Sequence, residues 1–296
     1  MKIDNKVLQD IQQINSIENT FFRDLLALLY FPSPFEIEFS TEFRFSINFQ
    51  NSFAELWDWY DTIKALPTPN LTKYLPLGKY AEELMLFYLT HSKNLELLAN
   101  NLQLIDEKIT IGEVDYLLKE ADSSKYYHLE FAIKFYLKTT RHGEQIWLGP
   151  STKDWLNRKV MKLTEHQMKL GKSKMELFPK ALQRLNFQPK VCIKGMRFYP
   201  WREYEKLAIN SLSVSWWICV DDIENLRDDG REFSIIDSKI NWIFPYLNSL
   251  AKVDFVTLSA EVSQLLFNRN ELRIVRYDKF KNPIDNGFIV RKNWPN

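Results

Sequence analysis

Hydrophobic residues recur at helical spacing along the first thirty positions, which predicts one amphipathic helix over residues 3–29. From Phe35 to Phe49 the pattern changes, because every odd position except Thr41 is apolar and every even position is polar. A period of two predicts a strand, broken once near Thr41. Residues 51–65 are again helical, and a proline-rich connector follows. We therefore assign residues 1–76 to an N-terminal helix-strand-helix appendage.

The middle of the chain has the element order αβββαβ. Ser151 and Asp154, three residues apart, resemble a capping box that starts the second helix. These elements define a core domain over residues 77–200. The predicted elements are a helix over 77–91, strands over 95–105, 109–118 and 126–137, a helix over 152–170 and a strand over 190–199.

The last third of the chain predicts an α+β extension over residues 201–296, packed on the core. The whole chain is therefore expected to be a mixed α/β (α+β) protein with a core sheet flanked by helices. The extension is predicted to contain strands over 214–220, 272–277 and 288–290 and helices over 235–251 and 258–267.

Composition narrows the class of protein. The chain has 296 residues, 45% of them hydrophobic and 15% aromatic, which is enough to bury a large core and excludes disorder as the main state. Only 8 glycines are present, and neither GxGxxG nor GxxxxGK[ST] occurs. Cys192 and Cys219 both lie in apolar stretches and provide no disulfide framework. With no apolar run long enough for a leader or a membrane span, we expect a cytoplasmic protein without membrane contact.

Charge is balanced overall but not along the chain. Lys and Arg total 39 against 38 Asp and Glu, yet residues 153–206 hold 14 basic and 5 acidic side chains, a local excess of 14 − 5 = +9. Residues 1–76 hold 6 basic and 10 acidic side chains. The basic middle is explained equally by a phosphate-binding face and by solvated helix surfaces.

Two carboxylates occur where apolar side chains are expected. In the strand over 126–137 the odd positions are apolar, whereas the even face carries Glu130 and Lys134. Asp115 stands between Val114 and Tyr116 in the preceding apolar strand, and hairpin pairing would bring it beside Glu130. Two buried anions side by side repel each other, so a cation should lie between them. Oxygen ligands of this kind suit Mg²⁺ or Mn²⁺.

Three further polar residues point to the same end of the sheet. Glu82 lies on the apolar flank of its helix, whereas Glu83 is placed to pair with Lys79. Gln167 interrupts the apolar stripe of the second helix, and Lys159 flanks that stripe. Each residue alone is more simply an ion pair or a satisfied amide. Such ordinary pairings do not readily explain why all of these residues would lie at one site.

The motif series Glu82, then Gly112-Glu113-Val114-Asp115, then Glu130 with a following lysine resembles the PD-(D/E)XK nuclease superfamily, the restriction-endonuclease-like fold. Within it, the chain resembles the bacterial family DUF1853, a domain of unknown function. The blocks that carry this resemblance are LGKYAEEL, TIGEVDYLL, HLEFAIKFYL, WLGPSTKDWLNRK, HQMKL, KGMRFYPW and NGFIVRKNWP, so it covers most of the chain.

The superfamily resemblance implies that Asp115 and Glu130 hold a divalent ion, with the Phe131 carbonyl, and that Glu82 contacts it directly or through water. Gln167 would orient a ligand or the nucleotide. The superfamily's lysine normally follows the glutamate by two residues, but Ala132 occupies that position. Lys134 lies one strand repeat further, about 6.6 Å along the same face, and Lys159 could take the role from the helix.

These features predict an Mg²⁺- or Mn²⁺-dependent nuclease that hydrolyses phosphodiester bonds of DNA or RNA. A second hypothesis is a catalytically weak or inactive nucleic-acid-binding protein on the same fold, because Ala132 replaces the usual lysine. A third is a protein-interaction scaffold in which the acids form ordinary ion pairs, suggested by the near-neutral net charge and the alternating segment from Phe35 to Phe49.

Overall fold

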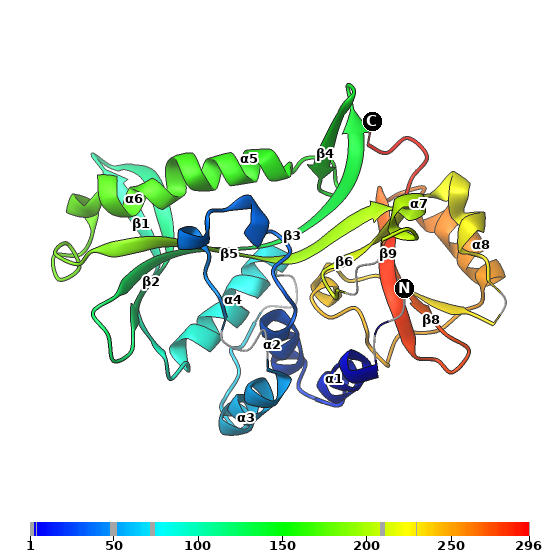
Figure 1. The fold of residues 1–296 in the computed structure, drawn as a ribbon, viewed down its shortest axis with the longest axis horizontal. Helices are drawn as coiled ribbons and strands as arrows, with labels where there is room; N and C mark the ends of the chain where they lie inside the picture. The colour runs from blue at the N-terminus through cyan, green and yellow to red at the C-terminus, as the bar shows by residue number, and fades with distance from the viewer. Residues whose placement is uncertain are drawn as a thin grey trace.

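A mixed sheet of nine strands organises the chain in the computed structural model, which describes residues 3, 5–47, 52–71, 75–207, 211–228 and 230–295 (Figure 1). The strands are β1 (Leu95–Asp106), β2 (Ile109–Glu120), β3 (Tyr126–Arg141), β4 (Glu144–Leu148), β5 (Phe187–Pro200), β6 (Val214–Cys219), β7 (Glu232–Ile236), β8 (Glu271–Tyr277) and β9 (Pro283–Val290).

The strand order is β1-β2-β3-β5-β6-β9-β8-β7, with β4 paired to the far end of β3. Both ends of the sheet are antiparallel, whereas the central pairs β3–β5, β5–β6 and β6–β9 are parallel. β5 belongs to the predicted core and β6 to the predicted C-terminal extension. Because these two strands pair, a single sheet spans both regions. The predicted order αβββαβ is found over residues 77–200, with β4 inserted before the second helix.

Helices cover both faces of the sheet. In Figure 1, α2, α3 and α4 lie below it, and a continuous helix of α5, η3 and α6 runs above it. η3 is a π-helical segment of that long helix. The α-helices are α1 (Asn5–Asn15), α2 (Thr20–Tyr30), α3 (Phe53–Ile63), α4 (Leu77–Thr90), α5 (Leu156–Met161), α6 (Met168–Ser173), α7 (Trp201–Tyr204) and α8 (Phe255–Leu265). Short helical turns are η1 (Glu36–Glu38), η2 (Thr41–Phe43), η3 (Lys162–Gln167), η4 (Met175–Leu177), η5 (Val220–Leu226) and η6 (Lys239–Trp242).

The two faces of β3 pack against different layers, as its alternation predicted. Leu129, Phe131 and Leu137 belong to the main core, together with α2 and α4. Tyr136 and Ala132, from the even positions, pack under the long helix formed by α5, η3 and α6. The polar residues of this even face are therefore enclosed between the sheet and that helix.

The single helix predicted over residues 3–29 is wrong, because the chain breaks between α1 and α2. The Asn19 side chain accepts hydrogen bonds from the backbone N–H groups of Phe21 and Phe22, which starts a new helix there. Apolar spacing continues across the break because both helices bury apolar side chains, and spacing alone does not reveal a cap.

The strand predicted from Phe35 to Phe49 is also wrong over the residues described, and Asn48 to Asn51 lie outside them. The chain forms η1 and η2 and makes one bridge to a strand, between Arg44 and Val191. Phe35 packs beneath the long helix, whereas Phe45 belongs to the main core and Ile37 is 73% exposed. The alternating apolar side chains therefore pack in different places and do not form one face of a sheet.

Two other helix boundaries differ from the predictions. The second core helix begins at Leu156 rather than at residue 152, and Asp154 does not cap it. The helix predicted over residues 235–251 is replaced by β7, η6 and irregular backbone, where consecutive residues from Trp242 to Phe244 are buried. The remaining predicted helices and strands are present with shifts of a few residues, and β4 was not predicted.

Candidate functional site

The candidate site lies where β2 and β3 separate. Their ladder runs from Lys119↔Tyr126 to Tyr116↔Leu129 and ends there, so Asp115 and Glu130 are the next positions on the two strands. The Asp115 carboxylate accepts a hydrogen bond of 2.8 Å from the Phe131 backbone N–H. The N–H and C=O of one strand residue point to the same side of the strand, so the Phe131 carbonyl also faces the gap. The predicted proximity of Asp115 and Glu130 is found.

Asp115 is held in surroundings that oppose its charge. Burial, followed by the negative charge of Glu130, raises the pKa of Asp115 from 3.8 to about 7. The Phe131 N–H and the Lys159 ammonium act in the opposite direction, and Glu82 raises the pKa further. The Asp115 carboxylate therefore interacts electrostatically with Glu130, Glu82 and Lys159.

Glu130 is fixed by hydrogen bonds to both of its carboxylate oxygens. His128 Nε2 lies 2.8 Å from Oε1, and Gln167 Nε2 donates to Oε2 at 2.6 Å. The side chains of His128 and Glu130 are each 1% exposed. Among the described residues, no Lys or Arg nitrogen lies within 4.0 Å of the Asp115 or Glu130 carboxylate oxygens. The groups that contact these two acids are thus backbone N–H, amide and imidazole.

The π-helical segment η3 places Gln167 over Glu130. A π turn holds more residues than an α turn, so it changes which side chains of a helix point inward, and such turns are common at functional sites. Here Leu163 and Met168 are both buried, and Gln167 lies between them on the inward face. The Gln167 Oε1 atom is buried and has no hydrogen-bond partner within the described part of the chain.

The two candidate lysines have different surroundings. Lys134 forms an ion pair with Asp154, which also accepts a hydrogen bond of 3.1 Å from the Tyr136 hydroxyl. Burial and, next, the charge of Lys134 lower the pKa of the Lys159 amine, whereas the Glu130 and Asp115 carboxylates raise it. In the described residues no carboxylate oxygen lies within 4.0 Å of the Lys159 amine. Lys134 is therefore engaged by Asp154, whereas Lys159 interacts with the Asp115 and Glu130 carboxylates and has no ion-pair partner in the described structure.

Glu82 is close to the other acids but carries its own cation. Lys79 Nζ donates to Glu82 Oε2 at 2.6 Å, so the expected pairing of Lys79 with Glu83 is wrong. A helix brings both i+3 and i+4 neighbours within reach, and the i+3 carboxylate is the one used. The Tyr116 hydroxyl donates to the Glu82 backbone carbonyl at 2.9 Å, which ties α4 to β2 beside Asp115.

The ligand chemistry of the site rests on two carboxylates. No group of three or more His, Cys, Asp or Glu side chains within the described ranges is arranged to hold a metal ion. The Phe131 carbonyl faces the same gap as Asp115, whose carboxylate accepts from the Phe131 N–H. Gln167 contributes an amide oxygen that has no partner in the described structure. Mg²⁺ commonly uses one or two carboxylates and completes its shell with water and substrate phosphate.

Sequence reasoning did not select His128 or Asp154 as site residues. His128 precedes Glu130 by two positions, so the strand period places both side chains on one face, and the spacing could have identified it. Asp154 follows an irregular turn after β4, where its backbone carbonyl accepts from the Gly149 N–H. No periodic pattern places that side chain beside Lys134.

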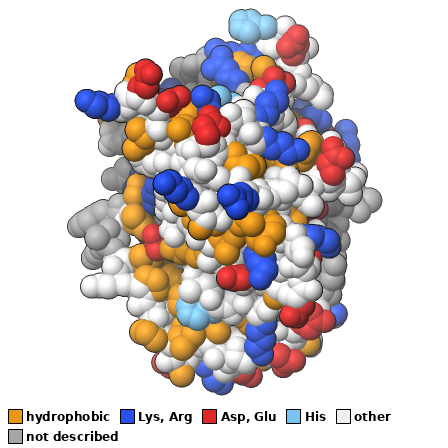
Figure 2. Space-filling view, turned by 90° about the vertical axis from the view of Figure 1, so that its left-hand side faces the viewer, with side chains coloured by type: hydrophobic (Ala, Val, Ile, Leu, Met, Phe, Trp, Pro, Cys, Tyr) orange, Lys and Arg blue, Asp and Glu red, His pale blue; other side chains and the backbone are white. Residues whose placement is uncertain are grey.

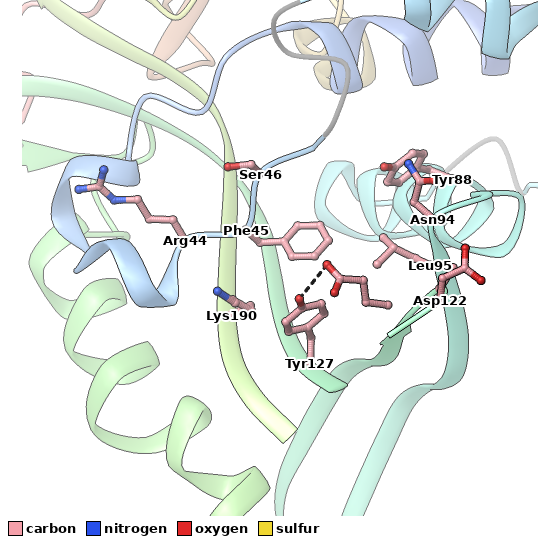
Figure 3. A pocket seen from close by; sticks show the side chains of 11 residues that line it. Arg44, Phe45, Ser46, Tyr88, Asn94, Leu95, Asp122, Tyr127 and Lys190 are labelled. Carbon is pink, nitrogen blue, oxygen red and sulfur yellow. Dashed lines mark hydrogen bonds between the residues drawn. The ribbon is translucent and has the colours of Figure 1, made fainter. Parts of the chain in front are cut away.

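A pocket of about 500 Å³ lies elsewhere, beside the turn between β2 and β3 (Figure 3). Its lining includes Arg44, Asp122 and Lys190, and the Tyr127 hydroxyl donates to Glu120 at 3.2 Å across it. None of the predicted site residues lines this pocket. Its two acids and two basic residues balance, and we assign it no role.

The basic middle of the chain contributes cations to one face of the molecule. Figure 2, a view of the left side of Figure 1, shows Lys and Arg side chains scattered over the whole face with Asp and Glu side chains among them. Arg158, Lys162, Lys169 and Lys172 of the long helix are exposed. This distribution is compatible with both explanations of the local excess, a phosphate-binding face and a solvated helix surface.

Comparison with known proteins identifies the family but adds no activity. No curated protein and no solved structure matches the chain significantly. No helix in the described ranges is long and apolar enough to cross a bilayer. The family model for DUF1853, a domain of unknown function, matches residues 43–275, which is most of the chain and includes both carboxylates. The chain therefore belongs to the DUF1853 family.

Proposed function

We propose that this protein is an Mg²⁺-dependent nuclease of the PD-(D/E)XK type that hydrolyses phosphodiester bonds of DNA or RNA. The observation that carries the proposal is the pair Asp115 and Glu130, placed one position beyond the end of the β2–β3 ladder without a Lys or Arg counterion in the described structure. A buried carboxylate pair of this kind is expected to recruit a cation.

The residues at the gap fit a magnesium ion in their donor chemistry. Asp115 and Glu130 would hold it, with the Phe131 carbonyl, and Glu82 would act through water because Lys79 already occupies its carboxylate. All of these donors are hard oxygens, which Mg²⁺ and Mn²⁺ prefer. When bound, the ion would lower the pKa of a coordinated water and neutralise charge on the scissile phosphate.

Lys159 takes the role of the superfamily's lysine in this proposal. Ala132 occupies the usual position, and Lys134 is engaged by Asp154. Lys159 carries an ammonium that interacts with both acids and lies in the long helix above them. A phosphate bound between the acids and this helix would accept a hydrogen bond from the Lys159 amine, which stabilises the charge that develops on its oxygens.

The test compares isosteric variants of the two acids. Asp115→Asn and Glu130→Gln remove one negative charge each, and we expect them to abolish Mg²⁺- or Mn²⁺-dependent cleavage of single-stranded DNA, duplex DNA or RNA. Glu120→Gln, at the other end of β2, is the matched control and should retain activity. If the wild type cleaves none of these substrates, or if Asp115→Asn cleaves as well as the wild type, the proposal is wrong.

A second candidate function is nucleic-acid binding without cleavage on the same fold. Ala132 and the ion pair between Lys134 and Asp154 favour it, because both withhold a lysine from the place where the superfamily has one. This function predicts nucleic-acid affinity that falls steeply with salt, because phosphate contacts release counterions. It also predicts no product after long incubation with either metal.

A further inference from the structure

We propose that His128 is a positioning residue, which fixes the Glu130 carboxylate for the metal through a hydrogen bond from its Nε2 atom. This inference rests on the proposed function, because it treats Glu130 as a metal ligand. His128 is two positions before Glu130 on the same face of β3, and its Nε2 lies 2.8 Å from Glu130 Oε1. The strand period brings the two side chains together without any loop.

The surroundings of His128 select one tautomer. Its Nδ1 atom is buried and has no hydrogen-bond partner in the described structure. A proton on Nδ1 would be a buried donor without an acceptor, which is unfavourable. The Nε2 atom is therefore the ring nitrogen that donates, and Glu130 Oε1 accepts its proton.

Helix α6 presses directly on the imidazole through Gly171. A Cβ atom built on Gly171 would lie 2.8 Å from His128 Nδ1, closer than real side chains approach. Glycine inside a helix is less stable than alanine, so its presence there needs a packing reason. The close approach of α6 holds the ring in place.

The two donors to the Glu130 carboxylate hold it from two sides and leave it able to bind a metal ion. His128 and Gln167 orient both oxygens of Glu130 from two different elements, β3 and η3. Each carboxylate oxygen has a second lone pair left for a metal ion. A lysine in the same place would neutralise the charge that attracts the ion and would repel it. Hydrogen bonds to ligating carboxylates are worth about 10–100-fold in metal affinity.

The test uses the different reach of two amide side chains. The Gln amide nitrogen can take the place of histidine Nε2, whereas the Asn amide nitrogen takes the place of Nδ1. We expect His128→Asn to weaken Mn²⁺ binding about 10–100-fold. His128→Gln should restore most of the affinity. Mn²⁺ binding is measured on the full chain by loss of the free-ion electron paramagnetic resonance signal, with folding checked by circular dichroism.

The outcomes separate this inference from the proposed function. If the wild type binds no Mn²⁺, the proposed function fails and takes this inference with it. If the wild type binds Mn²⁺ in an Asp115-dependent way while His128→Asn binds equally well, or while His128→Gln and His128→Asn are equally impaired, only the role of His128 is overturned.

Gly171→Ala provides a second variant that leaves the strand untouched. The added methyl group should displace the imidazole and weaken Mn²⁺ binding. It should also lower the melting temperature, although alanine is the better helix former. This variant decides the question if His128→Asn does not fold. Unchanged Mn²⁺ affinity in Gly171→Ala would overturn the proposed role.

Discussion

Asp115→Asn should make the metal-free protein more stable at pH 8 while removing metal binding. The Asn side chain keeps an oxygen that can accept from the Phe131 N–H, as Asp115 does at 2.8 Å. It removes the charge that burial and Glu130 oppose, because burial and that charge raise the pKa of Asp115 to about 7. The substitution therefore tests the electrostatics of the site independently of any catalysis.

The magnitude follows from the pKa of Asp115 in the folded and unfolded chain. The difference between 3.8 and about 7, at about 1.4 kcal/mol per pKa unit, gives a ceiling of about 4 kcal/mol. Because Asp115 keeps some contact with solvent, we expect about 2 kcal/mol in practice. The folded protein binds this proton more tightly than the unfolded chain, so the contribution of Asp115 to stability is lost as the pH rises from 3.8 through about 7.

The assay is thermal and urea unfolding of wild type and Asp115→Asn between pH 5 and pH 8 in the presence of a chelator. The two proteins should differ least at pH 5, and the variant should melt about 3 °C higher at pH 8. Saturating Mg²⁺ should reverse the order, since an ion at 100 times its Kd adds about 2.7 kcal/mol to the protein that binds it. Asp58→Asn, on α3, is the control. A constant difference between wild type and Asp115→Asn across this pH range would refute the reasoning.

Three further predictions test the lysines and the fold. Lys159→Ala should reduce cleavage by about two to three orders of magnitude, whereas Lys134→Ala should change it less than tenfold; equal losses in the two variants would contradict the assignment. Asn19→Ala should lower the free energy of unfolding by about 1 kcal/mol through loss of the α2 cap, measured by urea titration against Ser16→Ala. Gly195→Ala should prevent stable folding, because its Cβ would lie 1.7 Å from the Lys134 carbonyl oxygen at a φ of +126°, and a soluble variant with a wild-type melting temperature would refute this.

The sequence predicts the faces of the central elements well. Strict alternation in β3 assigned its odd positions to the main core, and this is where Leu129 and Phe131 lie. The same alternation assigned Glu130 to the opposite face, where Gln167 of η3 contacts it. These predictions succeed because burial of one strand face makes apolar and polar residues alternate, and this alternation can be recognised in a single sequence.

Features that depend on partner elements could not be predicted. The alternation from Phe35 to Phe49 gave no information on whether a strand edge was free to pair, and the described part of this segment makes one bridge. Helical spacing allowed Lys79 to reach either Glu82 or Glu83, and only the surroundings decide between them. The π turn that directs Gln167 toward Glu130 could not be predicted, because the apolar spacing of this segment also fits an uninterrupted α-helix.

The partners of the acidic residues distinguish the nuclease proposal from a protein-interaction scaffold. A scaffold explains Glu82 with Lys79 and Asp154 with Lys134, which are ordinary ion pairs near the surface. It does not explain Asp115 and Glu130, because their donors are a backbone N–H, an amide and an imidazole rather than Lys or Arg, while Lys159 interacts with both from the helix above. Removing one member of an ion pair leaves an unpaired charge and destabilises, whereas removing one member of a repelling pair stabilises. Opposite signs of the stability change for Lys79→Met and for Asp115→Asn would therefore favour a cation-binding site over a set of structural ion pairs.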